Sequence, residues 1–220
     1  MHNVITYIFQ LESGVEHRFD VNLDRTAATG DLPDWTLLET EKCAHCPLSN
    51  SAGARCPAAA DLAPVVEQFS ALASIDSIDV RVVREDYEAR KHTDTQTALS
   101  ALMGLILATS ACPILSRMRP LAHTHLPFCT DTQTVYRLCG MHLMDCFLAG
   151  KTPDLEGLTE LFADISKLNL AFARRITLAT QRDASINALV KLHSRSMLAS
   201  LSIDKKLDEI RAWFQPRPAG

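Results

Sequence analysis

The sequence predicts an α+β protein, in which a small mixed N-terminal sheet with a cysteine motif is followed by a mostly α-helical part. Apolar and polar residues alternate on both sides of Ser13-Gly14, which indicates a β-hairpin. Apolar residues recur at helical spacing after residue 92. With 220 residues, 47% of them apolar, the chain can bury a substantial core. We expect a mixed α/β part over residues 1–92 and a helical part over residues 93–220, packed as one unit.

The first part is expected to contain short strands and one helix. The hairpin strands run over residues 4–11 and 15–23, and Trp35 to Leu38 predicts a third short strand. Ala58 to Ala73 reads as a helix, because apolar side chains fall on one side and Pro57 sits at its first turn. Two further strands are predicted over residues 78–82 and 87–91, the second pairing back on the first.

The second part is expected to be a series of helices. Thr93 with Gln96 and Thr130 with Gln133 have the spacing of a capping box, ahead of helices over residues 98–109 and 135–148. A helix beginning at Thr152-Pro153 has the clearest apolar stripe, formed by Leu158, Leu161, Ile165, Leu168, Phe172 and Ile176. Helices over residues 186–201 and 203–214 follow. The pairs Arg174-Arg175 and Lys205-Lys206 are interpreted as solvated helix faces.

Composition narrows the classes of protein to consider. The net charge of −4 argues against a nucleic-acid-binding protein. No apolar run approaches the ~20 residues of a membrane span, and the first residues do not resemble an export signal. We therefore expect a cytoplasmic protein. In a reducing compartment its seven cysteines are expected to be thiols or metal ligands rather than disulfides.

Three cysteines have the spacing of a metal site. Cys43, Cys46 and Cys56 form a Cys-x2-Cys-x9-Cys motif, and a Cys-x2-Cys turn lets two thiolates converge on one metal. Cys56 precedes Pro57 and is predicted to cap a helix, where the helix dipole favours a thiolate. Cys112 precedes Pro113 in the same way, and we expect it to be the fourth ligand. His125, His123 and His45 are the alternatives. Zinc is the favoured metal, and an iron–sulfur cluster is the alternative cofactor.

Two other groups of residues could carry chemistry. The loop from Arg117 to Cys129 holds Arg119, His123 and His125. Its histidines could complete the metal site, act as acid and base, or lie in a polar loop, and its arginines could bind an anion or pair with acidic residues of the N-terminal half. Cys139, His142 and Cys146 share one face of a predicted helix. They are interpreted as buried small side chains rather than a second metal site.

Four short motifs resemble those of a family of uncharacterised bacterial proteins, which is described as a domain of unknown function. The motifs are Cys43 to Leu48 with the preceding Glu41-Lys42, the pair Cys56-Pro57, Ser110 to Pro113, and His125-Leu126-Pro127-Phe128. Asp183-Ala184 and Asn187 to Val190 are similar to it as well, so the resemblance covers most of the chain. It implies that Cys43, Cys46, Cys56, Cys112 and His125 belong to the family pattern. It implies no activity.

These observations support three hypotheses about function. The first is a metal-binding protein with a structural or regulatory role, acting through a protein partner or as a homo-oligomer. The second is a thiol-based redox or metal sensor, in which Cys43 and Cys46 form a disulfide. The third is a metalloenzyme with an open coordination position near His123 and His125. No Walker loop, dinucleotide fingerprint, nucleophile elbow or His-Glu-x-x-His motif is present, so the sequence identifies no reaction.

Overall fold

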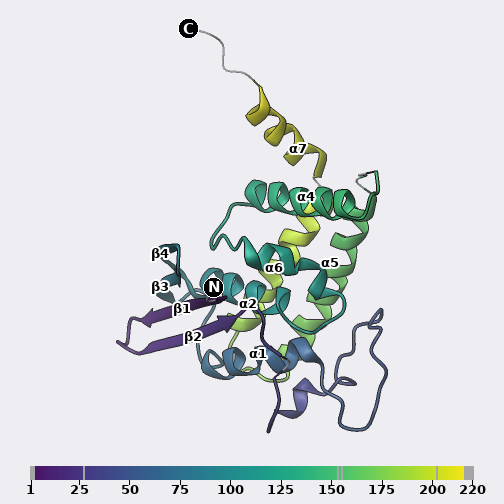
Figure 1. Cartoon of the computed structure of the whole chain (residues 1–220). Coiled ribbons are helices and arrows are strands. Elements are labelled where there is room, and N and C mark those ends of the chain that lie inside the picture. The colour runs from purple at the N-terminus through teal and green to yellow at the C-terminus, as the bar shows by residue number, and fades with distance from the viewer. Residues whose placement is uncertain (1–2, 27, 153, 155, 202, 216–220) are drawn as a thin grey trace.

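A computed structural model shows a four-stranded antiparallel sheet followed by a layer of helices (Figure 1). It describes residues 3–215 except 27, 153, 155 and 202, with the backbone alone at residues 156, 195–201, 203 and 204. The strands are β1 (Val4–Leu11), β2 (Glu16–Asn22), β3 (Ser77–Arg84) and β4 (Tyr87–Asp94), in the order β2-β1-β3-β4. The predicted α+β class and the hairpin are confirmed.

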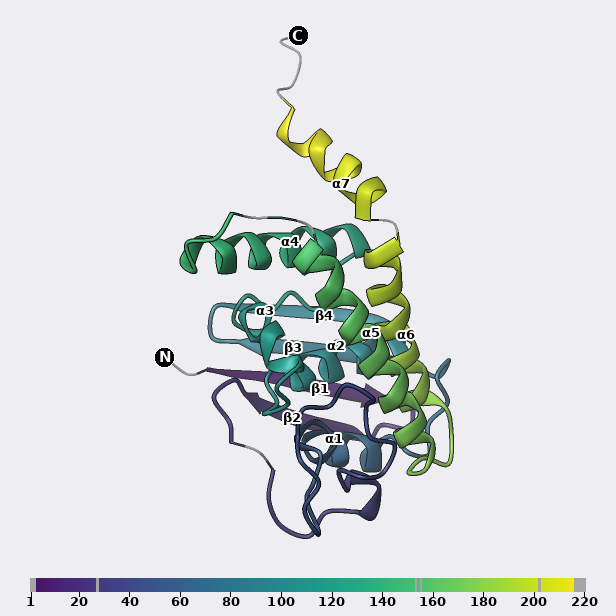
Figure 2. The same cartoon turned by 90° about the vertical axis from the view of Figure 1, so that its right-hand side faces the viewer.

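Helices account for most of the rest of the chain, one between β2 and β3 and the others after β4. They are α1 (Pro57–Gln68), α2 (Thr95–Ala108), α3 (Arg119–His123), α4 (Asp131–Leu148), α5 (Glu156–Thr177), α6 (Ala184–Leu201) and α7 (Ile203–Arg211). Short 3₁₀ turns are η1 (Asp34–Thr36), η2 (Leu115–Met118) and η3 (Ala212–Phe214). In Figure 2, α5 and α6 run side by side, α4 lies across one end of them, and α7 points away. No helix within the described residues has the length and apolar character needed to cross a membrane.

One hydrophobic core joins the sheet to the helices. Tyr7 on β1 lies opposite Phe19 on β2 and Val82 on β3, and the inward-facing side chains of these strands pack against α1, α2, α5 and α6. This core includes residues from both predicted parts of the chain. A second, smaller core lies between α4, α5 and α7, around Val135 and Phe162. The predicted apolar stripe of α5 is buried along its whole length, as expected for a helix with that periodicity.

Two predicted helix starts had opposite outcomes. Thr130 and Gln133 form the expected capping box at the start of α4. The box predicted for Thr93 and Gln96 was wrong, because β4 continues through Thr93, which pairs with Ile78. Asp94 caps α2 instead, accepting a hydrogen bond of 2.8 Å from the backbone N–H of Thr97. The predicted start at Thr152-Pro153 lies partly outside the described residues.

Two predicted boundaries need correction. Trp35 to Leu38 does not form a strand, because backbone hydrogen bonds from Thr36 to Pro33 and from Leu37 to Asp34 close a 3₁₀ turn. In the described structure, this segment keeps one isolated bridge, between Leu37 and Arg55. Helix α1 ends at Gln68 rather than at Ala73. Beyond this end, the carbonyl oxygen of Ser70 accepts a hydrogen bond of 3.0 Å from the backbone N–H of Arg182.

Candidate metal centre

The Cys43–Cys46 pair is held in a tight turn. The backbone N–H of Cys46 donates a hydrogen bond of 3.0 Å to the carbonyl oxygen of Cys43. Next to this turn, the ammonium group of Lys42 donates to the carbonyl oxygen of Leu48 at 2.6 Å and to the side-chain oxygen of Asn50 at 2.8 Å. Both ends of the turn are therefore tied to one cation, which keeps the two thiols near each other.

Cys56 caps α1, as predicted. Its backbone is extended, and its sulfur makes no capping hydrogen bond, but the nearby N–H groups of Ala58 and Ala59 act to lower the pKa of its thiol. Its own N–H donates 2.8 Å to the carbonyl oxygen of Thr36, which fixes the chain before the helix. The start of α1 therefore favours the thiolate form of Cys56 electrostatically, in opposition to burial.

Cys112 repeats this arrangement after α2. The N–H groups of Ile114 and Leu115 act to lower the pKa of its thiol, and its carbonyl oxygen accepts a hydrogen bond of 2.9 Å from the backbone N–H of Ser116. Pro113 lacks an N–H, so the chain can turn immediately after the cysteine without leaving a donor unpaired. Both Cys-Pro pairs thus place a thiol beside backbone N–H groups that favour its charged form.

These elements bring four predicted ligands together, and we call Cys43, Cys46, Cys56 and Cys112 the cysteine cluster. The thiol of Cys43 interacts electrostatically with the other three, and all four pack on the main core. All four are free thiols. Burial, followed by the neighbouring thiols, raises the pKa of Cys43 to about 12. Burial also raises the pKa values of Cys56 and Cys112.

Arg175 is the principal residue that sequence reasoning missed at this site. It was interpreted as part of a solvated helix face, but only 1% of it is exposed. Its guanidinium donates to the carbonyl oxygens of Trp35, at 2.9 Å, and Leu37. Its Nε has no hydrogen-bond partner, and no ion pair with an acidic side chain is found for it among the described residues.

The cysteine cluster is the principal electrostatic neighbour of Arg175. Burial lowers the pKa of Arg175, and the thiols of Cys56, Cys43 and Cys46 oppose this shift more strongly than the carboxylate of Glu41 does. A signal for this placement was present in the sequence, because Arg175 follows Phe172 by three residues and Leu168 by seven. That spacing puts it on the apolar side of α5.

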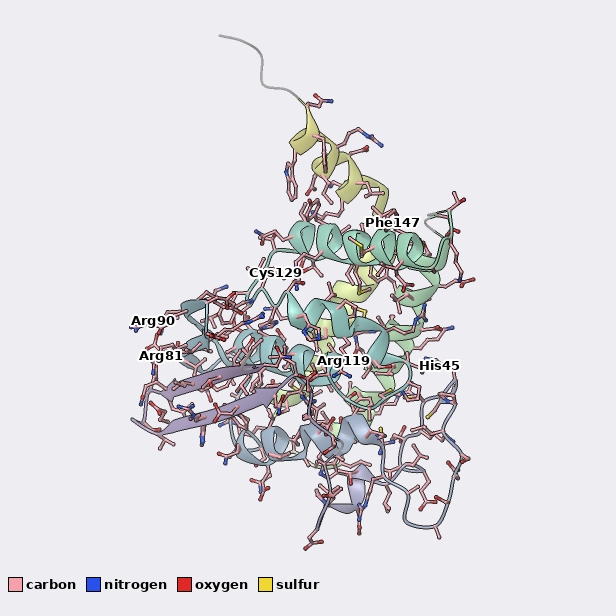
Figure 3. The ribbon with its side chains drawn as sticks, in the orientation of Figure 1. His45, Arg81, Arg90, Arg119, Cys129 and Phe147 are labelled. Atoms are coloured by element: carbon pink, nitrogen blue, oxygen red, sulfur yellow. The ribbon has the colours of Figure 1, made fainter. Side chains whose placement is uncertain are left out.

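His45 is a second unsatisfied polar group at the cluster. It lies between Cys43 and Cys46, and both of its ring nitrogens are buried without a hydrogen-bond partner. Figure 3 shows it on the loop ahead of α1, well apart from Cys129. As the described side chains stand, no three histidines, cysteines, aspartates or glutamates are arranged to hold a single metal ion. The cysteine cluster is therefore a set of neighbouring thiols rather than a closed tetrahedron.

The structure places the other candidate residues elsewhere. His125 makes a hydrogen bond of 2.6 Å with the hydroxyl of Tyr7, and burial, helped by Arg137 and Arg84, lowers its pKa to about 3. His123 is exposed. Arg119 pairs with Asp24 of the N-terminal half at 3.0 Å, as expected, whereas Arg117 lies 3.9 Å from Asp164 on α5.

The cysteines of α4 agree with their interpretation as packed thiols. Cys146 is buried, and Cys139 packs against the smaller core. The sulfur of Cys146 lies 3.7 Å from Nε2 of His142, and the same nitrogen lies 2.7 Å from the carbonyl oxygen of Asp154. His142 is therefore engaged by the backbone at the nitrogen that faces Cys146.

Comparison with known proteins agrees with the resemblance seen in the motifs. The family model described as a domain of unknown function, DUF6901, matches residues 5–215. A comparison with curated proteins gives no match, and neither does a comparison with solved structures.

Proposed function

Because the chain belongs to the DUF6901 family, whose description names no activity, we propose a function from its own residues: it is a cytoplasmic metal-binding protein. The cysteine cluster would hold a zinc ion or an iron–sulfur cluster. All seven cysteines are free thiols, which supports a reducing compartment.

The charge of Arg175 carries this proposal. A buried guanidinium costs several kcal/mol unless a negative charge compensates it. Arg175 faces neutral thiols, and we find no acidic partner for it in the described part of the chain. Four thiolates bound to one Zn²⁺ ion, or to an iron–sulfur cluster, give a centre with a net charge of about −2. A metal centre at the cysteine cluster would therefore supply the missing negative charge.

The backbone N–H groups near two of the thiols support the same conclusion. Those of Ala58, Ala59, Ile114 and Leu115 act to lower the pKa values of Cys56 and Cys112, in opposition to burial. Such donors stabilise metal thiolates and orient first-shell ligands. His45 adds two unsatisfied nitrogens beside the same thiols. The donor set therefore fits a thiolate-bound metal.

The choice between the two cofactors depends on how far the sulfurs stand apart. A zinc ion needs four sulfurs at about 2.3 Å from one point, so the Cys43–Cys46 turn would have to close on it. An iron–sulfur cluster bridges more widely spaced sulfurs. The observed thiols neighbour one another without converging on one position. Both cofactors remain in the proposal, and elemental analysis separates them.

A structural role follows from where the ligands come from. The cysteine cluster joins the Cys43–Cys46 turn, the start of α1 and the segment after α2. A metal there would link parts of the chain that are distant in sequence, and its binding free energy would add to the free energy of unfolding.

We propose that the protein acts through a partner or as a homo-oligomer. The exposed side of α4 carries five large apolar side chains at helical spacing: Tyr136, Leu143, Met144, Phe147 and Leu148. Phe147 and Leu148 are each 77% exposed, and Figure 3 shows Phe147 at the outer edge of the molecule. Contiguous exposed apolar side chains are typical of protein interfaces.

The test is the metal content of protein purified without oxygen. We expect either one zinc per chain, or iron and sulfide with the brown colour of an iron–sulfur protein. Cys46→Ser and Cys112→Ser should each lose most of the metal. Cys139→Ser is the matched control, because Cys139 is a half-buried thiol outside the cysteine cluster, and it should keep the metal. Metal-free wild-type protein from zinc- and iron-supplemented cells would refute the proposal.

A further inference from the structure

A cavity of about 180 Å³ lies among α2, α4, α5 and α6, and it is separate from the cysteine cluster. Most of its wall is apolar, and representative side chains are Leu105, Met118, Leu138, Phe162, Ile165 and Leu192. An apolar protein cavity of about 150 Å³ is large enough to admit benzene. The space therefore suits one aromatic ring or a short acyl chain.

Six polar side chains line the same cavity, among them His125, Cys129 and Arg137; the others are Ser100, Thr134 and Asn169. Nη2 of Arg137 donates to the carbonyl oxygens of Leu121 and Thr124, at 2.9 Å and 2.7 Å. Its Nη1 lies 4.0 Å from the sulfur of Cys129. The guanidinium is thus fixed at the cavity wall by backbone oxygens.

The cavity contains a positive charge without a matching negative one. No aspartate or glutamate is among the described residues that line it, and Arg137 makes no ion pair with the described acidic side chains. His125 does not add a charge, because burial keeps its pKa near 3. Outside the wall, the ammonium group of Lys91 lies 5.5 Å from the ring centre of Phe128, which lines the cavity. The surroundings of Arg137 therefore favour an anion.

We infer that this cavity binds a small amphipathic monocarboxylate, with its apolar body among the leucine and phenylalanine side chains and its carboxylate on the guanidinium of Arg137. An arginine held in a fixed orientation is suited to two parallel hydrogen bonds with a carboxylate. The volume limits the apolar body to about one aromatic ring or six to eight carbon atoms. This inference is independent of the proposed metal, since none of the cysteine-cluster residues lines the cavity.

Octanoate and benzoate are the probes, with 1-octanol as the uncharged match for octanoate. Titration calorimetry on the full chain, purified with any metal it carries, should show octanoate binding at least tenfold more tightly than 1-octanol. Arg137→Gln should weaken octanoate binding at least tenfold and leave 1-octanol binding unchanged. Arg174→Gln is the control, because Arg174 is exposed on α5, and it should bind octanoate like the wild type.

A second variant tests the space rather than the charge. Ala101 lines the cavity, and Ala101→Leu places a larger side chain in it. This variant should lose binding of octanoate and 1-octanol alike, while circular dichroism confirms that it is folded. Failure of both carboxylates to bind wild-type protein at millimolar concentration would overturn the inference. So would equal binding of octanoate by the wild type and by either Arg137→Gln or Ala101→Leu.

Discussion

His125 and Tyr7 are in direct contact across 118 positions of the chain: Nε2 of the imidazole lies 2.6 Å from the phenolic oxygen. Tyr7 is fully buried on β1, and burial raises its pKa well above the usual value. Because the neighbouring Arg137 and Arg84 also disfavour a charged imidazole, the pair is a neutral hydrogen bond that ties the loop after α3 to the sheet.

The first prediction concerns acid stability. The folded-state pKa of His125, about 3, lies below its unfolded value of about 6.5, so protons bind preferentially to the unfolded chain between these values. The contribution of this residue to stability is complete above pH 6.5 and falls as the pH falls. Between pH 7 and pH 5, the free energy of unfolding should fall by about 1–2 kcal/mol less in His125→Gln than in the wild type, as measured by urea unfolding.

His123→Gln is the matched control for this experiment, because His123 is an exposed histidine two residues away. It should show the same acid sensitivity as the wild type. Equal pH dependence of His125→Gln and the wild type would show that His125 is protonated as readily in the folded chain as in the unfolded one.

The second prediction concerns Arg175, whose removal should have different effects on metal affinity and on the stability of the metal-free protein. In metal-loaded protein, Arg175→Met should lower metal affinity at least tenfold, because the anionic centre loses its buried counter-charge. In metal-free protein the same change should leave the free energy of unfolding unchanged or increase it, since it removes a buried cation for which no ion pair is found among the described residues. Chelator competition and urea unfolding measure the two effects.

Arg174→Met controls for the loss of one positive charge from α5. Its metal affinity and its free energy of unfolding should both stay at their wild-type values. If Arg175→Met destabilises the metal-free protein by several kcal/mol, its hydrogen bonds to Trp35 and Leu37 matter more than its charge.

The third prediction concerns removal of the metal. Cys46→Ser, or treatment of the wild type with a strong chelator, should lower the melting temperature by at least about 5 °C, because the metal binds the folded chain far more tightly than the unfolded chain. Differential scanning fluorimetry measures this shift. Chelator should have no further effect on Cys46→Ser, and an additional shift in that variant would place the metal at another site.

The fourth prediction concerns α4. Phe147→Glu and Leu148→Glu together should convert a self-associated chain to a monomer in sedimentation experiments, because charged side chains oppose burial of this face. Leu178→Glu is the control, since Leu178 is 64% exposed at the end of α5 and lies outside the α4 face. If the wild-type chain sediments as a monomer, self-association is wrong, and the α4 face would bind a different protein instead.

The sequence was most informative where local chemistry decides the structure. The capping box at Thr130 and the apolar stripe of α5 were predictable because each depends on residues within a few turns. The helix start predicted at Thr93 was wrong because Thr93 pairs with Ile78 on β3, which lies 15 residues earlier in the chain. The same distinction applies to the candidate site: Cys56 was predictable as a cap, whereas Arg175 became significant only through its position against Trp35 and the distant cysteines.

The contact between His125 and Tyr7 could not be predicted from the histidine spacing alone. A His-x-His pattern is compatible with a metal ligand, an acid–base pair or a polar loop, and the choice depends on which strand faces it. A metal role for His125 stays a prediction, and it would require loss of the 2.6 Å contact with Tyr7 if the metal used the same nitrogen.

The irregular segment between β2 and α1 has a consequence for proteolysis. Ordering such a segment costs about 1–2 kcal/mol per residue, and its described part contains one 3₁₀ turn and one isolated bridge. Arg175 holds its middle through Trp35 and Leu37, but the Cys43–Cys46 turn beyond it depends on Lys42 and the cysteines. Trypsin should therefore cut metal-free protein first after Lys42. The two fragments should stay together after the cut, because β1, β2 and the later elements share one core.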